Sequence, residues 1–167
     1  MRAGARHAFG TADLAGRKVV ISGFGSVGEL IARGLTGADV VVSDVDTSRR
    51  TGEFGWVEPE EAYTTTADVL VPAAVGGVLS PEVVRNLDVK LVVGPANNQL
   101  TEDGVAGLLA ARGIVWVPDH VASAGGVVYT LAREDDGVDH ETALRRVDGI
   151  EAAVGRLLRQ REDSQLQ

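Results

Sequence analysis

The 167-residue chain has no cysteine, only two lysines and few aromatic side chains, which make up 4% of its residues. Without cysteine, neither a disulfide framework nor a thiolate metal site can form, and we expect no metal site. The net charge of −8 lacks the basic surplus that holds nucleic acid, so no nucleic acid partner is expected. No apolar run approaches the roughly eighteen residues that span a bilayer, and the first residues lack a signal-peptide core. We therefore expect a cytoplasmic protein with no membrane partner.

Apolar segments rich in β-branched residues alternate with helical patterns along the chain. Such segments are typical of strands buried on both faces, and the helices between them predict parallel pairing through right-handed crossovers. The sequence therefore predicts an α/β fold with a doubly wound, Rossmann-like parallel sheet in a single domain. The expected strands are residues 17–22, 38–43, 68–71, 90–93 and 113–117, and the expected helices are residues 27–35, 81–86 and 101–112.

The chain divides into three expected parts. Residues 1–16 form a lead-in helix, residues 17–138 the Rossmann domain, and residues 139–167 a long C-terminal amphipathic helix. This helix carries one apolar stripe with spacings of three and four: Leu144, Val147, Ile150, Val154, Leu157 and Leu158. The stripe either covers the sheet or lies partly at an interface with another subunit or a missing domain.

The stretch GFGSVG fits the pattern G-x-G-x-x-G, follows an expected strand and opens an expected helix. In this pattern Gly23 makes the tight turn, Gly25 gives the backbone room to approach a pyrophosphate, and Gly28 allows close helix–strand packing. The helix N-terminus favours negative charge. Such a turn can also be purely structural, so the pattern alone is weak evidence for a dinucleotide site.

Asp44 strengthens that prediction, because it ends the next expected strand 21 residues after Gly23. A carboxylate at this point accepts hydrogen bonds from the adenosine ribose. It would also repel a 2′-phosphate, which favours NAD over NADP. Arg49 and Arg50 lie nearby and leave NADP open.

Further candidates lie in the loops that follow the expected strands, because ligands of such sheets bind beyond the carboxyl ends. These loops are residues 72–77, 94–99 and 118–126. Asn97 and Asn98 can donate and accept hydrogen bonds, which suits a nicotinamide carboxamide or a ribose. The alternative is an asparagine pair that stabilises a turn.

Five ordered segments together resemble the cofactor domain of the Glu/Leu/Phe/Val amino-acid dehydrogenases, nearest to the leucine and valine branch: GFGSVG, SDVD, PAAVGG, PANNQL and PDHVASAGGVVYTLARE. The resemblance runs from residue 1 to about residue 161. It implies NAD as cofactor, hydride transfer, and a small substrate related to an amino, imino or keto acid. The implied nucleotide contacts are Gly23, Phe24, Gly25, Ser26, Val27, Gly28, Asp44, Val45, Ala73, Ala74, Val75, Ala96, Asn97 and Asn98. The implied substrate pocket comprises Asn98, Ser123, Val127 and Thr130.

The lysine content departs from this family, whose amino-terminal domain supplies catalytic and substrate-binding lysines. Lys18 and Lys90 both lie at expected strand starts, so neither can take those roles. We therefore expect a chain that lacks the lysine-bearing domain, with a homodimer or a partner chain supplying the missing surface. His120 and Asp119 are the candidate catalytic groups for proton transfer from a strand-end loop. The alternatives are an ordinary polar loop residue and a surface carboxylate.

Two local departures accompany the missing lysines. The segment between Asp44 and Glu58 is too short for the helix that the family places there, and Trp56 is expected to fill some of the space. Ser123 stands where the leucine branch has asparagine, which puts a hydrogen bond to substrate or cofactor in doubt.

The leading hypothesis is an NAD-dependent oxidoreductase derived from an amino-acid dehydrogenase. The alternatives are a non-catalytic module that binds NAD(H) or a partner, and a folded relic without function.

Overall fold

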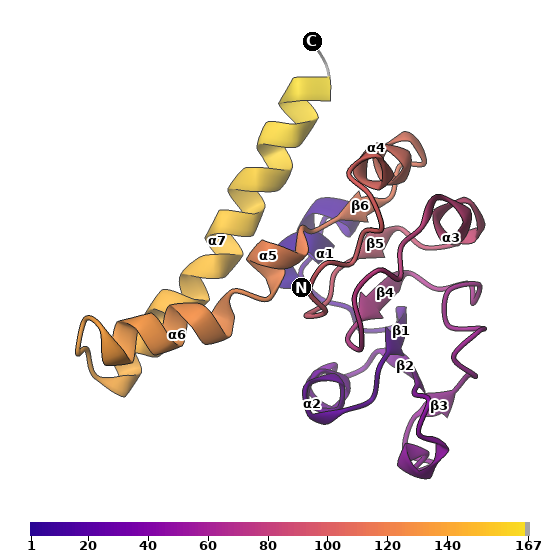
Figure 1. Ribbon diagram of the computed structural model, residues 1–167, viewed down its shortest axis with the longest axis horizontal. Coiled ribbons are helices and arrows are strands. Elements are labelled where there is room, and N and C mark those ends of the chain that lie inside the picture. The colour runs from indigo at the N-terminus through magenta and orange to yellow at the C-terminus, as the bar shows by residue number, and fades with distance from the viewer. Residues whose placement is uncertain (166–167) are drawn as a thin grey trace.

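Six strands form one fully parallel sheet in the order β3-β2-β1-β4-β5-β6 (Figure 1). The computed structural model describes the backbone of residues 1–165 and the side chains of residues 1–161. This strand order is that of doubly wound dinucleotide-binding folds, so the predicted fold class is confirmed. The strands are β1 Lys18–Ser22, β2 Asp39–Ser43, β3 Gly55–Trp56, β4 Val69–Pro72, β5 Leu91–Val92 and β6 Val115–Trp116.

Helices cover both faces of the sheet. Those on one face are α1, α2 and α7, and those on the other are α3 and α4, while α5 and α6 lead from β6 to α7 (Figure 1). The helices are α1 Arg2–Phe9, α2 Ser26–Gly34, α3 Pro81–Asn86, α4 Gly104–Ala111, α5 Asp119–Ala122, α6 Gly125–Glu134 and α7 His140–Gln165, with a 3₁₀ helix η1 at Thr47–Arg49.

Alternate residues of each central strand pack into two separate hydrophobic clusters. Val19 and Ile21 pack with α1, α2 and α7, whereas Val20 packs with α3 and α4. All three side chains are fully buried. Successive strand residues point to opposite faces, so covering both faces explains why the strands are apolar throughout rather than at every second position.

The strand register brings three carboxyl ends to one edge of the sheet. Ser22 pairs with Ser43 of β2 and with Pro72 of β4. The residues that follow these strand ends therefore start from neighbouring positions. The strand order reverses between β1 and β4, which is where ligands of such sheets bind.

The start of α3 was predicted correctly, and the contacts there are those expected from the sequence. The Ser80 side chain accepts a hydrogen bond from the Val83 amide at 3.2 Å, and Pro81 occupies the first turn. A serine cap satisfies an amide that the helix leaves without a partner, and proline there loses no helical hydrogen bond.

The sequence did not predict β3, α5 or α6. A strand of two residues is too short to show a period. Residues 118–126 were expected to be a loop because they follow an expected strand, but they contain α5 and the start of α6. His120 therefore lies in a short helix and not in a loop.

Helices α6 and α7 form a hairpin that extends beyond the sheet (Figure 1). The apolar stripe of α7 divides between two environments. Val154 and Leu158 are buried against the sheet-side cluster and Ile150 packs at its margin, whereas Leu144 is 44% exposed. No helix in the described part of the chain is long and apolar enough to cross a membrane.

Candidate nucleotide and substrate site

The three glycines of the turn between β1 and α2 occupy different environments. Gly23 has a φ of +109°, and a Cβ there would lie 2.6 Å from the amide nitrogen of Ala74. A Cβ at Gly28 would lie 2.0 Å from the carbonyl oxygen of Gly23, whereas a Cβ at Gly25 would meet nothing within 4 Å. Gly25 also precedes α2, whose first turn has no side-chain cap. The backbone therefore packs closely at Gly23 and Gly28, whereas Gly25 has free space in front of it.

Asp44 joins the end of β2 to this turn. Its Oδ2 accepts a hydrogen bond from the Phe24 amide at 2.7 Å, and its Oδ1 accepts one from the Asp46 amide at 2.9 Å. The side chain is 14% exposed. A carboxylate offers about four acceptor positions, so two internal hydrogen bonds leave capacity for ribose hydroxyl groups.

Arg49 lies over the same turn between two carboxylates. Its Nη1 donates to the Phe24 carbonyl oxygen at 3.2 Å, and its Nε lies 3.4 Å from Asp46 and 3.8 Å from Asp44. Hydrogen bonds from Ser48 lower the pKa of Asp46, which stays ionised at neutral pH. Two carboxylates and one guanidinium give this cluster a net charge of −1, which disfavours a further phosphate.

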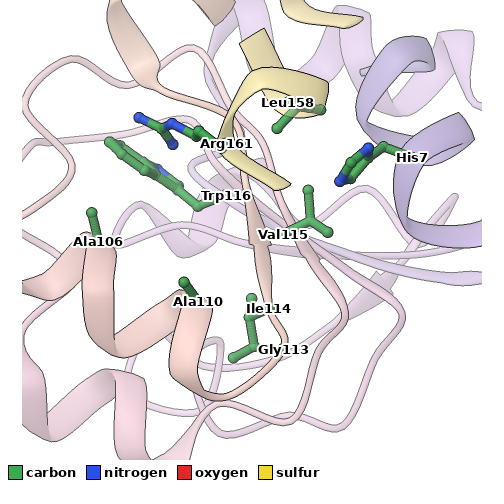
Figure 2. A pocket seen from close by; sticks show the side chains of 9 residues that line it. All are labelled: His7, Ala106, Ala110, Gly113, Ile114, Val115, Trp116, Leu158 and Arg161. Carbon is green, nitrogen blue, oxygen red and sulfur yellow. The ribbon is translucent and has the colours of Figure 1, made fainter. Parts of the chain in front are cut away.

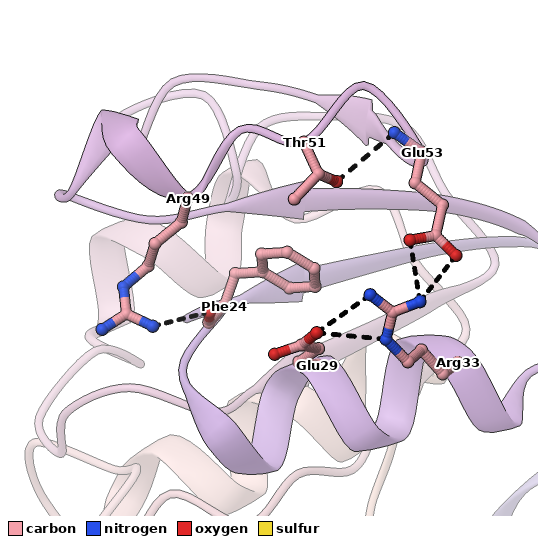
Figure 3. A network of polar contacts seen from close by, with 6 residues as sticks. All are labelled: Phe24, Glu29, Arg33, Arg49, Thr51 and Glu53. Atoms are coloured by element: carbon pink, nitrogen blue, oxygen red, sulfur yellow. Dashed lines mark hydrogen bonds and ion pairs between the residues drawn. The ribbon is translucent and has the colours of Figure 1, made fainter.

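The short connection between β2 and β3 is held against α2 by a polar network (Figure 3). Arg33 Nη1 donates to both carboxylate oxygens of Glu53 at 2.7 and 2.8 Å, and Arg33 Nη2 donates to Glu29 at 2.9 Å. These hydrogen bonds raise the pKa of Arg33. Only three residues of this connection are helical, in η1, so the expectation that no full helix fits here is confirmed.

Phe54, rather than Trp56, covers the glycine-rich turn from this connection. The Phe54 and Phe24 rings meet edge to face, with centroids 5.7 Å apart. Trp56 instead forms part of β3, and its indole Nε1 donates to Glu58 at 3.2 Å. Both Phe54 and Trp56 pack at the margin of the core, so each fills part of the space left by the missing helix.

The loops after β4 and β5 close against each other. Gly77 donates its amide to the Asn98 carbonyl oxygen at 2.7 Å, and a Cβ at Gly76 would lie 2.5 Å from the Asn97 carbonyl oxygen. Asn98 has a φ of +52°, a left-handed conformation that asparagine tolerates better than most residues. Asn98 therefore stabilises a turn, which was the alternative interpretation of the asparagine pair.

A cavity of about 590 Å³ opens beside these loops, between the start of α2 and the segment from α5 to α6. It brings together five sequence-predicted residues from three separate segments of the chain: Val27, Asn97, His120, Ser123 and Val127. Pro95, Ala122, Ala124, Gly125 and Gly126 complete the wall. Among the described residues, the cavity is not lined by Asn98 or Thr130.

The other predicted nucleotide contacts differ in how much side chain they expose. Phe24 and Ala96 are buried, so only their backbones can contact a ligand. Val45 and Val75 are 87% and 68% exposed, and Ala74 is exposed beside Gly23. Ala73 donates its amide to the Ser22 carbonyl oxygen at 2.7 Å, which aligns the loop after β4 with the end of β1.

Gln99 organises the loop after β5, and the sequence analysis did not single it out. Its side chain is fully buried and its Nε2 donates to the carbonyl oxygens of Gly94 and Ala96 at 2.9 and 3.0 Å. Its Oε1 accepts from Trp116 Nε1 at 3.1 Å, and its amide donates to Asp119 Oδ2 at 2.8 Å. In the sequence, Gln99 is marked only as a polar residue next to apolar Leu100. Its hydrogen-bond partners are evident only in the folded chain.

The two candidate catalytic residues, His120 and Asp119, have contrasting environments. The His120 side chain is 73% exposed at the cavity, and its Nδ1 lies 3.8 Å from Asp119 Oδ1. Asp119 accepts backbone amide hydrogen bonds at both oxygens, from Gln99 and from His120 at 2.7 Å. Asp119 is therefore suited to position neighbouring backbone, whereas the His120 side chain is accessible to a ligand.

Lysines and metal-binding clusters are both missing from this site in the described residues. Lys18 begins β1 and Lys90 directly precedes β5, so both lie at the amino ends of parallel strands, opposite the cavity. No group of three or more histidine, aspartate or glutamate side chains in the described part of the chain could hold a metal ion.

A second cavity, of about 220 Å³, lies at the β6 edge of the sheet between α4 and α7 (Figure 2). The Arg161 guanidinium lies 5.5 Å from the centre of the Trp116 ring there. No predicted site residue lines this cavity, whose wall consists of His7, Ala106, Ala110, Gly113, Ile114, Val115, Trp116, Leu158 and Arg161.

Known proteins are similar to this chain in both sequence and fold. The chain is 36% identical over 165 residues to the leucine dehydrogenase of Bacillus cereus and 33% identical over 162 residues to the phenylalanine dehydrogenase of Lysinibacillus sphaericus. These alignments cover 95% and 90% of this chain, but only 45% and 42% of the two relatives. The crystal structure of L-tryptophan dehydrogenase from Nostoc punctiforme superposes with a TM-score of 0.90 at 31% identity, covering 98% of this chain and 52% of that one.

The sequence profile of one family covers more than half of the chain. The Glutamate/Leucine/Phenylalanine/Valine dehydrogenase profile matches residues 42–132, which include Asp44, the loop after β5, α5 and most of α6. The relatives are amino-acid dehydrogenases, and L-tryptophan dehydrogenase shares the fold over 98% of this chain. The chain therefore belongs to the glutamate/leucine/phenylalanine/valine dehydrogenase family.

Proposed function

We propose that this chain is the NAD(H)-binding part of an oxidoreductase that acts on a small amino, imino or keto acid. The observation that carries the proposal is the turn at Gly25, which is open to a ligand at the point where the strand order reverses and lies close to the Asp44 carboxylate. Residues 17–138 form the nucleotide-binding domain in this proposal. Residues 1–16 lead into it, and the C-terminal helix, expected over residues 139–167, packs on the domain or at an interface; residues 166 and 167 lie outside the described residues.

The residues at the turn fit the chemistry of a dinucleotide. The amides at the start of α2 suit a pyrophosphate, and Asp44 has acceptor capacity for the adenosine ribose. The cluster of Asp44, Asp46 and Arg49 has a net charge of −1, which supports NAD over NADP. The proposed nucleotide contacts are Gly23, Phe24, Gly25, Ser26, Val27, Gly28, Asp44, Val45, Ala73, Ala74, Val75, Ala96, Asn97 and Asn98.

The cavity supplies the proposed substrate side of the site. Val127 is 64% exposed there and offers an apolar contact, and Ser123 lies in the same wall. The other proposed substrate residues, Asn98 and Thr130, are outside the cavity lining. When bound, NAD(H) would supply the hydride donor or acceptor. Reducing an imino acid to an amino acid adds one hydride at carbon and one proton at nitrogen. We assign the proton to the accessible His120 imidazole, with Asp119 as its positioning partner.

Substrate turnover is proposed to need a surface from outside the residues that line the cavity. The lining residues named above include no lysine or arginine, so a substrate carboxylate would meet no permanent positive charge. A second copy of the chain, or a separate protein that carries lysines, would complete the site.

Calorimetry with NAD⁺, NADH and ADP-ribose tests the binding part of this proposal. We expect all three to bind, and failure of all three would contradict it. Turnover is tested by following NADH oxidation with branched-chain and aromatic keto acids plus ammonia, with and without an added lysine-bearing amino-terminal domain from a related dehydrogenase. Turnover that depends on the added domain supports the oxidoreductase assignment.

The second candidate function is a non-catalytic module that binds NAD(H) or a partner. It is favoured by one observation, the position of Lys18 and Lys90 at the end of the sheet opposite the cavity. Cofactor binding without turnover under every partner condition would support this module over the oxidoreductase.

A further inference from the structure

The cavity of about 220 Å³ at the β6 edge of the sheet combines an apolar wall with a permanent positive charge (Figure 2). Ile114 and Leu158 are buried in its wall, and α4 contributes Ala106 and Ala110. Arg161, on α7, is exposed and lines the same cavity. A dry apolar cavity of about 150 Å³ binds benzene, so this one has room for a ring that carries one or two further carbon atoms.

Arg161 and Trp116 lie together on one side of this cavity (Figure 2). The Arg161 guanidinium is 5.5 Å from the centre of the Trp116 ring. A guanidinium matches a carboxylate with paired hydrogen bonds, and an indole ring offers a large flat apolar face. This combination suits a small molecule that has an apolar body and one carboxylate.

Trp116 also connects this cavity to the loop after β5. Its indole Nε1 donates to Gln99 Oε1 at 3.1 Å, and Gln99 Nε2 donates to the Ala96 carbonyl oxygen at 3.0 Å. The next residue, Asn97, lines the 590 Å³ cavity. Contiguous hydrogen bonds and packed side chains of this kind carry energetic coupling between separate sites. Because Gln99 is fully buried, a displaced Trp116 ring cannot leave this residue and its loop undisturbed.

We propose that the 220 Å³ cavity binds a small apolar carboxylate through Arg161 and Trp116, and that its occupancy is transmitted through Gln99 to the loop that lines the proposed cofactor site. The binding site itself is independent of the proposed function. Only the transmitted effect rests on the proposed NAD(H) binding. The cavity would thus regulate cofactor affinity from the outer edge of the sheet.

Calorimetry with phenylacetate and phenylacetamide tests the binding site in the full chain. The two compounds have nearly the same shape, but only phenylacetate carries a charge. We expect phenylacetate to bind with a dissociation constant of about 1 mM or below, as its ten non-hydrogen atoms allow. Phenylacetamide should bind about fivefold more weakly or worse, because it lacks the charge that pairs with Arg161.

Two substitutions locate the ligand. Arg161→Gln should reduce phenylacetate affinity about fivefold, to that of phenylacetamide. Arg156→Gln makes the same charge change on α7 outside the cavity lining and should have no effect. Ala110→Leu fills part of the cavity from an exposed helical position and should weaken both compounds.

Tryptophan fluorescence reports the contact with Trp116 directly. The chain has two tryptophans, so Trp56→Phe leaves Trp116 as the only one. Phenylacetate should change the fluorescence of this variant over the same concentration range as in calorimetry. Unchanged fluorescence despite binding would place the ligand away from Trp116.

The transmitted effect is measured as the affinity for NAD⁺ with and without saturating phenylacetate. We expect a change of about threefold or more, and saturating NAD⁺ should change phenylacetate affinity by the same factor, because coupling between two sites is reciprocal. Trp116→Phe keeps an aromatic ring but removes the donor to Gln99. This variant should still bind phenylacetate, but the effect on NAD⁺ affinity should disappear.

The possible failures can be told apart. Equal affinity for phenylacetate and phenylacetamide, or phenylacetate binding that is unchanged in both Arg161→Gln and Ala110→Leu, would overturn the proposed binding site. Phenylacetate binding that leaves NAD⁺ affinity unchanged would overturn the transmitted effect. If the unaltered protein binds phenylacetate but neither NAD⁺ nor ADP-ribose, the proposed NAD(H) function is wrong, and the transmitted effect with it, whereas the binding site is supported.

Discussion

The Asp44 carboxylate and the Phe24 backbone amide are joined by a 2.7 Å hydrogen bond. This bond ties the residue after β2 to the glycine-rich turn after β1, so the two parts of the proposed nucleotide site have a fixed relative position. A charge-assisted hydrogen bond of this kind is stronger than one between neutral groups. The turn is therefore organised before any ligand arrives.

The contrast between Gly25 and Gly28 gives the first prediction. Gly25→Ala should leave the unfolding free energy nearly unchanged, because the new methyl group meets nothing within 4 Å and the backbone is extended. It should weaken NADH binding by about tenfold or more, since the methyl group occupies space needed by a pyrophosphate. Calorimetry and urea unfolding measure the two effects.

Gly28→Ala is the paired variant, and the opposite pattern is expected. Its Cβ would lie 2.0 Å from the Gly23 carbonyl oxygen, so the turn must shift, at a cost of about 1–3 kcal/mol. A large loss of stability in Gly25→Ala, or none in Gly28→Ala, would contradict the assigned environments.

The second prediction concerns the choice between NADH and NADPH. Asp46→Asn keeps an acceptor oxygen for the Ser48 amide but removes one negative charge beside Arg49. We expect NADPH affinity to rise about fivefold relative to NADH, which corresponds to about 1 kcal/mol for a charge pair near the surface. Asp39→Asn, at the other end of β2, should change neither affinity. If Asp46→Asn leaves the preference for NADH over NADPH unchanged, the Asp46 carboxylate does not neutralise Arg49 toward a 2′-phosphate.

Gln99 provides a prediction about stability. Gln99→Leu leaves the Gly94 and Ala96 carbonyl oxygens and the Trp116 indole without the partners they now have. The loss should be about 2–4 kcal/mol in urea unfolding. Asn86→Leu removes an exposed amide and should cost no more than about 0.5 kcal/mol. Equal effects of the two substitutions would rule out Gln99 as the organiser of its loop.

Tyr63 should make stability depend on pH in alkaline solution. Burial raises the pKa of Tyr63, an effect that its 2.8 Å hydrogen bond with Ser22 partly opposes. With a folded-state pKa above the unfolded value of about 10, the stabilisation is complete below that value and is lost as pH rises through the folded-state pKa. Urea unfolding between about pH 9 and about pH 11 should show this loss, and Tyr63→Phe should reduce it. Tyr129→Phe serves as the comparison and should leave the loss in place.

Much of the fold, and the residues of the proposed nucleotide site, followed from local sequence patterns. Runs rich in β-branched residues predicted five of the six strands to within about two residues, and Ser80 with Pro81 located the start of α3. Gly23 and Gly28 followed from the motif because the backbone packs closely at both, and Asp44 followed from its place at the end of β2, where it accepts the Phe24 amide.

The remainder depended on contacts that a local pattern does not encode. Strand β3 forms because Trp56 pairs with Val42 of β2, and no run of apolar residues marks it in the sequence. Asp119 carried the right residue type for proton transfer, yet its two oxygens accept amides from Gln99 and His120. Ser123 was identified from its unusual identity, but its partner Asn97 became visible only in the folded chain.

The brevity of the connection between β2 and β3 has a practical outcome. Only three residues of this connection are helical, in η1, and the Val45 side chain is exposed to solvent. Few atoms would therefore enclose the adenine half of the proposed cofactor. NAD⁺ anchored to a chromatography resin through its adenine ring should therefore still reach Gly25 and Asp44, and the protein should be retained on such a column and eluted by free NADH.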